Sequence, residues 1–122
     1  MPSSETPVFI LPFDSISLRD LPRVGGKNAS LGEMFSTLSP RGIPVPDGFA
    51  VTAEGYWLFL KENQLENPLA ELMRQLDLNT FSNLPDIGAR ARALMMQGRL
   101  PQALAAEIRE GYGVLKIREV CE

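Results

Sequence analysis

The sequence predicts an α+β fold, with short strands in the front half and a helical second half. Two brief apolar runs, at residues 8–13 and 49–51, have the composition of strands, and two prolines force extended backbone just before the second run. Beyond Thr52, apolar residues recur at helical spacing. Because two or three short strands do not make a complete α+β sandwich, we expect one lobe of a larger domain.

The first elements follow from local composition. Residues 1–7 are polar and contain prolines, so we expect a disordered N-terminus, followed over residues 8–122 by the front portion of a domain. Residues 8–13 predict an edge strand that Pro12 stops. Residues 39–42, Ser-Pro-Arg-Gly, predict the end of the first helix, and residues 43–48 predict extended chain.

Two glycines and a lysine, Gly25, Gly26 and Lys27, open the first helix. Glycine lacks a Cβ atom, so the backbone can turn tightly and its N–H groups can approach an anion closely. We expect the helix to begin near Asn28 or Ser30, both good caps, and to add the positive end of its dipole to the charge of Lys27. Its expected buried face is Leu31, Met34, Phe35 and Leu38.

This pattern alone leaves two interpretations open. It is not a Walker A loop, since no glycine stands five residues before Gly26 and no Ser or Thr follows Lys27. One interpretation is a phosphate site. The other is a structural turn, in which the glycines serve the geometry and the lysine is solvated.

Four helices are expected in the second half. Thr52 is placed to cap a helix that runs to about residue 62, and we expect its aromatic face, Tyr56 and Trp57 included, to be core. Asn67 with Pro68, then Pro85, then Pro101 mark three further starts. The expected buried residues of these three helices are Leu69, Leu72, Met73, Leu76, Ile87, Ala91, Leu94, Met95, Leu104, Ala105, Ile108, Tyr112 and Leu115.

Composition excludes several functions. The 122 residues carry a net charge of −3 with scattered Lys and Arg, which argues against a nucleic-acid partner or a membrane surface. The apolar run near the N-terminus is too short for a signal core or a membrane span. The single Cys121 cannot form an internal disulfide, which fits the cytoplasm.

Two long motifs point to a family. Residues 24–34 read Val-Gly-Gly-Lys-Asn-Ala-Ser-Leu-Gly-Glu-Met, and residues 42–56 read Gly-Ile-Pro-Val-Pro-Asp-Gly-Phe-Ala-Val-Thr-Ala-Glu-Gly-Tyr. In these residues the chain resembles the amino-terminal part of the phosphoenolpyruvate synthase and pyruvate phosphate dikinase family. The Asn28-Ala29-Ser30 form is more similar to the synthase, and the similarity thins after about Leu60.

The resemblance implies part of an ATP-grasp-type domain that binds ATP and Mg²⁺. It implies an ATP-binding loop in which Lys27 contacts the phosphates and Gly25, Gly26 and Asn28 shape the backbone around them, with the Mg²⁺ ligands in later sequence. A complete enzyme of this kind would convert ATP, pyruvate and water to AMP, phosphoenolpyruvate and phosphate through a phosphohistidine. Because the chain has no histidine, we assign it no catalytic residue and expect the isolated chain to lack dikinase activity. Pyruvate is expected as a substrate only of the full-length enzyme.

Other polar residues receive structural roles at this point. Glu33 and Glu54 are expected in first helical turns, where a carboxylate favours the helix dipole, and neither has a companion at metal-ligand spacing. No metal site is therefore assigned. Arg90, Arg92 and Arg99 are expected on a solvated face.

Three functional readings remain at this point. The chain is the front part of a phosphoenolpyruvate synthase, part of another dikinase with a different acceptor, or a stand-alone nucleotide-binding or regulatory module. The ending at Glu122, before the family's Arg-Ser-Ser-Ala segment, is consistent with a truncated gene, a frameshift or an engineered piece. With so few strands, we expect Phe9, Ile10, Phe49 and Val51 to be incompletely shielded.

Overall fold

The structure, a computed structural model, describes residues 7–121, with side chains as far as residue 116. The expected disordered N-terminus thus falls almost wholly outside the described residues. Two compact units are present. The first combines residues 7–56 with residues 102–121, and the second is Trp57–Pro101.

A two-stranded antiparallel sheet lies at the centre of the first unit. Strands β1 (Ile10–Pro12) and β2 (Phe49–Val51) pair with Leu11 opposite Ala50. The second strand has the predicted bounds, and β1 is shorter than predicted because Phe13 turns into a 3-10 helix, η1 (Phe13–Ser15). Flanking backbone bonds extend the pairing, from Phe13 N–H to Gly48 C=O (2.9 Å) and from Thr52 N–H to Phe9 C=O (2.9 Å).

Helix α1 (Leu21–Leu38), preceded by the 3-10 helix η2 (Leu18–Asp20), covers one side of this sheet. Ala29 is fully buried and Gly32 is buried, and both were missing from the predicted face. Leu31 and Phe35 pack against the core as expected, whereas Met34 is exposed. The face is rotated because glycine at position 32 lets Ile16 approach the helix backbone directly. The core cluster of this unit is Phe13, Ile16, Val24, Ala29 and Ala50.

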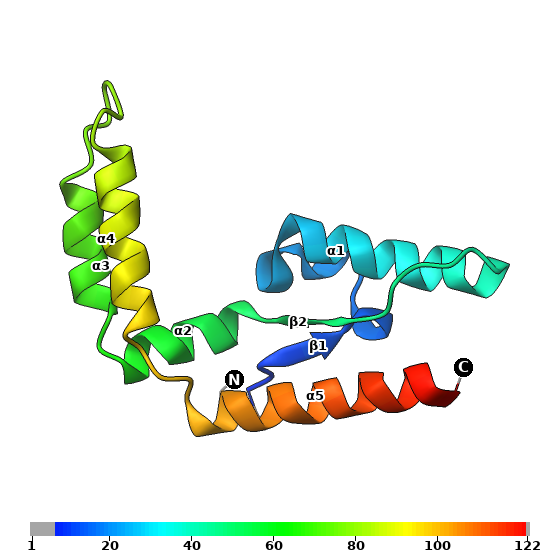
Figure 1. Ribbon diagram of the computed structural model, residues 1–122. Helices are drawn as coiled ribbons and strands as arrows, with labels where there is room; N and C mark the ends of the chain where they lie inside the picture. The colour runs from blue at the N-terminus through cyan, green and yellow to red at the C-terminus, as the bar shows by residue number, and fades with distance from the viewer. Residues whose placement is uncertain (1–6, 122) are drawn as a thin grey trace, which may run out of the picture. The chain divides into compact units, whose positions relative to one another are not determined.

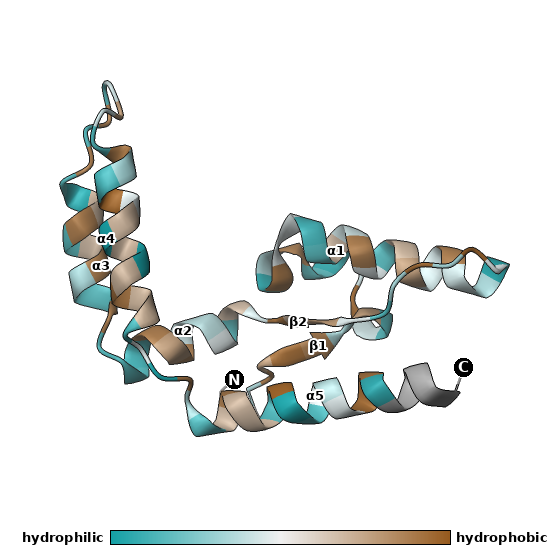
Figure 2. Cartoon of the chain, viewed as in Figure 1, coloured by the Kyte–Doolittle hydropathy of each residue, from teal (hydrophilic) through white to brown (hydrophobic). Residues whose placement is uncertain are grey.

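The opposite side of the sheet is covered by α5 (Gln102–Cys121), as Figure 1 shows. In Figure 2, β1 is drawn as hydrophobic, while α5 alternates between hydrophilic and hydrophobic residues along its length. Gly111 of α5 lies against Ile10 and Phe49, since a Cβ at position 111 would come within 2.8 Å of the Ile10 side chain. Ile10 and Phe49 are nonetheless only half-buried, as is Phe9, and Val51 is exposed, so the expectation of incomplete shielding is confirmed. On α5 itself, Leu104 is buried as predicted and Tyr112 is exposed.

The segment that links α1 to β2 has the structure that the sequence predicts. A 3-10 helix, η3 (Ser39–Arg41), ends at Gly42, whose φ of 81° is left-handed. Residues 43–48 have no regular structure and lead into β2 as an extended segment. Prolines and glycines determine this segment through their own backbone preferences, so local sequence predicts it well.

The second unit contains a pair of helices packed side by side, α3 (Glu66–Arg74) and α4 (Leu84–Met96). The preceding helix α2 (Ala53–Glu62) crosses the boundary between the units. Helix α3 begins before Asn67, so Asn67 is not its cap, and Met73 is exposed. The buried residues of this unit are Leu60, Leu65, Leu72, Ile87 and Pro101.

The connector between α3 and α4 is organised around one carboxylate. Asp77 accepts hydrogen bonds from the N–H groups of Asn79 (2.9 Å) and Thr80 (3.2 Å). These bonds, with that from Thr80 first, hold the pKa of Asp77 below its usual value. Pro85 lies in the first turn of α4, as predicted.

The α+β class is confirmed, because the described chain is mostly helical with one small sheet. Over residues 7–121, no helix combines the length and the apolar character that a membrane span requires.

Replacing Gly32 by Ala should destabilise the chain by about 1–3 kcal/mol, the usual cost of overpacking a filled core. The new Cβ would lie 2.5 Å from the Ile16 side chain and 2.7 Å from its carbonyl oxygen. Urea unfolding measures the change. Gly113→Ala is the matched control, since nothing lies within 4 Å of its Cβ position, and it should stabilise α5 by about 0.5–1 kcal/mol. Equal effects of the two variants would contradict this packing.

Candidate functional site

Helix α1 is broken at Gly25. The backbone there has φ 82° and ψ 167°, so the helix consists of residues 21–24 and residues 26–38 on either side of one non-helical residue. Only glycine adopts this conformation readily. The predicted glycine turn is present, but the helix resumes directly after Gly25. Asn28 and Ser30 therefore lie inside the helix, and the prediction that one of them starts it is wrong.

The break places a helix N-terminus at the surface. The first N–H groups of a helix lack an acceptor in the preceding turn, and they carry the positive end of the helix dipole. Those positions belong here to Gly26, Lys27 and Asn28. Gly25, Gly26 and Lys27 are all exposed, and one of these N–H groups belongs to a lysine.

The four residues expected to form a site differ in their surroundings. Among the described residues, the ammonium group of Lys27 has no ion pair or hydrogen bond. Asn28 is half-buried, and its side-chain N–H donates to Val24 C=O (3.0 Å), which ties together the two sides of the break. The structure thus brings Gly25, Gly26 and Lys27 to the surface and turns the Asn28 carboxamide toward the backbone.

The glycines of α1 are present for different reasons. Gly25 is required by its positive φ, and Gly32 by its contact with Ile16. Gly26 has neither requirement, because its φ is not positive and its Cβ position would lie 3.6 Å from the Leu21 side chain, an ordinary contact. Glycine costs the interior of a helix about 1 kcal/mol relative to alanine and less at its start, where Gly26 lies, so the described chain offers no structural reason for Gly26.

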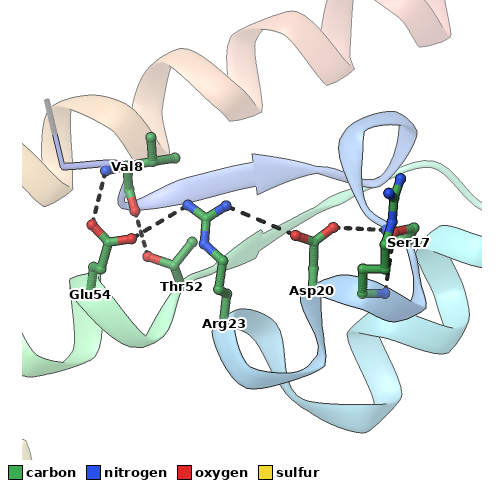
Figure 3. Close-up of polar contacts among 7 residues, drawn as sticks. Val8, Ser17, Asp20, Arg23, Thr52 and Glu54 are labelled. Atoms are coloured by element: carbon green, nitrogen blue, oxygen red, sulfur yellow. Dashed lines mark hydrogen bonds and ion pairs between the residues drawn. The ribbon is translucent and has the colours of Figure 1, made fainter. Parts of the chain in front are cut away.

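An arginine that the sequence analysis did not single out lies just before the turn. The Arg23 guanidinium contacts Glu54 (Nη2–Oε1, 3.4 Å) and Asp20 (Nη1–Oδ1, 3.9 Å), as Figure 3 shows. Asp20 also accepts the Ser17 N–H (3.0 Å) as part of a capping box at η2. The position of Arg23 beside the glycines was a usable signal, whereas its partner Glu54 lies 31 residues away and no local pattern connects the two.

Thr52 caps α2, as predicted. Its side-chain oxygen accepts the Gly55 N–H (3.2 Å), and its hydroxyl donates to Val8 C=O (2.6 Å). The side chain is almost completely buried, and these two bonds use its one donor and one of its acceptor positions. Thr52 therefore serves the structure and does not face a ligand.

The acidic residues also have identifiable partners. Glu54 lies in the first turn of α2, as expected, and accepts the Val8 N–H (3.3 Å). Glu33 lies in the middle of α1 instead of a first turn, because that helix starts at Leu21, and it accepts the Leu18 N–H (3.1 Å). No group of three or more Asp, Glu, Cys or His side chains able to hold a metal ion occurs in the part of the chain that the structure describes.

Two aromatic residues of α2, Tyr56 and Trp57, are not core. Tyr56 and Trp57 are 45% and 57% exposed, because the buried positions of this helix are Gly55 and Leu60. Gly55 lies against Val51, where a Cβ would come within 3.0 Å of that side chain. Arg92 is exposed as expected.

Comparison with known proteins gives consistent matches. Residues 21–120 match the family model described as pyruvate phosphate dikinase, AMP/ATP-binding domain. The chain is 43% identical over 106 residues to phosphoenolpyruvate synthase of Synechocystis sp., and 42% identical over 104 residues to that of Deinococcus radiodurans. The synthase of Escherichia coli is 37% identical over 106 residues.

These alignments cover most of this chain and little of the relatives. They include 87%, 85% and 87% of the chain, in the same order, and 13% of each synthase. The chain therefore spans about an eighth of the length of the relatives it matches. The family match begins at Leu21, the first residue of α1, and includes the broken turn.

Substitutions at two neighbouring glycines should differ in their effect on stability. Gly25→Ala should cost about 1–3 kcal/mol, because alanine is strained at this φ and ψ. Gly26→Ala should leave stability unchanged or raise it by up to about 1 kcal/mol, because its Cβ meets only an ordinary contact. Thermal unfolding of the two variants tests this, and a destabilised Gly26→Ala beside an unaffected Gly25→Ala would contradict the geometry of the turn.

Proposed function

The chain belongs to the family of the pyruvate phosphate dikinase AMP/ATP-binding domain, and we propose on that premise that it is the N-terminal part of the ATP-binding domain of a phosphoenolpyruvate synthase. The identities of 37–43% to synthases of three bacteria support this assignment. The domain would be of the ATP-grasp type. The full-length enzyme would convert ATP, pyruvate and water to AMP, phosphoenolpyruvate and phosphate.

The observation that carries the proposal is Gly26. A helical glycine that neither backbone strain nor internal packing requires is explained if a ligand approaches its backbone closely. Its neighbours supply what an anion needs, namely N–H groups at a helix start and the ammonium of Lys27, which has no partner among the described residues. The triphosphate of ATP is the anion that the family assignment supplies.

Each residue of the turn then has a role. Gly25 breaks the helix, and the N–H groups of Gly26, Lys27 and Asn28 bind a phosphate group. The Lys27 ammonium adds a charge-assisted contact, and the Asn28 side chain holds the break in shape. Phosphoryl transfer depends mainly on positioning and on positive charge placed near the phosphates, which is what this turn would contribute.

The described residues supply no cluster fitted to hold Mg²⁺. By the family resemblance, the ligands of the Mg²⁺ that accompanies ATP would lie in later sequence. The phosphohistidine would likewise come from elsewhere in the enzyme, since this chain has no histidine. A single cysteine, which cannot form an internal disulfide, fits a cytoplasmic enzyme.

Lys27→Ala should weaken ATP binding about ten- to a hundred-fold, the size of one lost charge-assisted contact. Isothermal titration of the chain with ATP measures the change, and stability without nucleotide should be unaffected because Lys27 is exposed. Lys27→Arg should restore binding only in part, because a planar guanidinium replaces a compact ammonium poorly in a tight turn.

Arg92→Ala is the control for loss of a positive charge at an exposed position. It should leave ATP affinity unchanged. If Lys27→Ala had no effect while Arg92→Ala weakened binding, the phosphate site would not be at the turn.

The Gly26→Ala variant tests ATP binding independently of protein stability. Its methyl group should weaken ATP binding by about ten-fold or more, because it occupies the space through which phosphate reaches the N–H groups, while the variant stays as stable as the original chain. Titration with ATP and thermal unfolding of the same sample measure both quantities. Unchanged ATP affinity would contradict the proposal that phosphate approaches the backbone at Gly26.

A further inference from the structure

One ion pair connects the start of α1 with the start of α2. Glu54, in the first turn of α2, accepts the Arg23 guanidinium at 3.4 Å through Oε1 and the Val8 N–H at 3.3 Å through Oε2. Figure 3 shows this arrangement, with Arg23 reaching Glu54 on one side and Asp20 on the other. Arg23 thus lies between two carboxylates that belong to different elements.

The Glu54 end of this connection is well anchored. Val8, just before β1, gives its N–H to Glu54 and accepts the Thr52 hydroxyl (2.6 Å) at its C=O. Both backbone polar groups of Val8 are therefore bonded to residues at the start of α2. This fixes the Glu54 carboxylate relative to the sheet.

The turn at Gly25 needs support from outside its own helix. In a continuous helix, backbone hydrogen bonds transmit the orientation of one turn to the next, and the φ of 82° at Gly25 interrupts that regularity. Residues 29–38 are held by the burial of Ala29 and by the contact of Gly32 with Ile16. Residues 26–28 precede these contacts and are tied to the segment before the break by the bond from Asn28 to Val24 C=O. Residues 21–24 are held by the burial of Val24 and by the ion pairs of Arg23.

We propose that Arg23 and Glu54 are positioning residues of the phosphate turn. Their ion pair fixes the segment before Gly25, so that the N–H groups of residues 26–28 and the Lys27 ammonium converge on one place. Neither side chain touches the phosphate. The nucleotide part of this inference rests on the proposed function, and the positioning part is tested without nucleotide.

The Glu54→Gln variant distinguishes positioning from simple electrostatics, because the two predict opposite changes in ATP affinity. Electrostatics alone predicts that Glu54→Gln binds a polyanion more tightly, because a negative charge near the site is removed and Arg23 is released toward the ligand. Positioning predicts weaker binding, because glutamine does not hold the guanidinium by charge. Exposed ion pairs are modest in strength, so we expect ATP affinity to fall roughly two- to five-fold.

The experiment titrates the chain and its Glu54→Gln variant with ATP and measures backbone order by NMR relaxation without nucleotide. In the variant, order parameters of residues 26–28 should fall from about 0.85 toward the roughly 0.6 of flexible backbone. The matched control is Glu71→Gln, which breaks the exposed pair between Arg74 and Glu71 (2.9 Å) in the second unit. It should change neither quantity.

Arg23→Lys is the second variant and carries the test if Glu54→Gln does not fold. It keeps the positive charge but cannot reach both carboxylates with a planar fork, so it should weaken ATP binding and lower the same order parameters.

Tighter or unchanged ATP binding together with unchanged order at residues 26–28 would overturn the inference. If the original chain does not bind ATP, the proposed function fails, and the order parameters alone decide whether Arg23 and Glu54 position the turn.

Discussion

The conformation of a single residue, Gly25, governs the arrangement around the turn. Its positive φ divides α1 and places the start of residues 26–38 at the surface, beside Lys27. A continuous helix would use its backbone N–H groups internally at this point. Support for the broken backbone comes from several directions, including the Asn28 side chain, the buried Ala29 and the ion pairs of Arg23.

The small sheet is the platform for this arrangement. A two-stranded sheet is marginal by itself, and here α1 and α5 cover its two sides. Close approach depends on glycines, with Gly32 admitting Ile16 and Gly111 admitting Ile10. Gly25, Gly32 and Gly111 thus serve backbone geometry or packing. Gly26 and Gly113 have neither requirement, and of these two Gly26 is the one at the resumed helix start beside Lys27.

Features set by neighbouring residues could be predicted from the sequence. The bounds of β2, the Thr52 cap, the turn at Gly42 after η3 and the broken turn all depend on local preferences of proline, glycine and threonine. The family resemblance through residues 24–34 and 42–56 is confirmed by the family match. The roles of Gly25, Gly26, Lys27 and Asn28 as ATP ligands stay a prediction.

Features that depend on distant residues could not be predicted. Helical spacing alone placed Tyr56 and Trp57 in the core, but Gly55 and Leu60 are the buried positions of α2. The return of α5 to cover the sheet depends on contacts with residues about a hundred positions earlier, such as the bond from Phe9 N–H to Glu107 (3.3 Å). The pairing of Arg23 with Glu54 likewise joins residues far apart in the sequence, so no local pattern predicts it.

The most direct test of the central claim is an NMR titration of the isotope-labelled chain with ATP and, separately, with adenosine. If phosphate binds at the turn, ATP should shift the amide signals of Gly26, Lys27 and Asn28 in a saturable way. Adenosine has no phosphate and should leave these three signals unchanged. ATP shifts that are confined to other residues, or equal shifts with both compounds, would contradict the account.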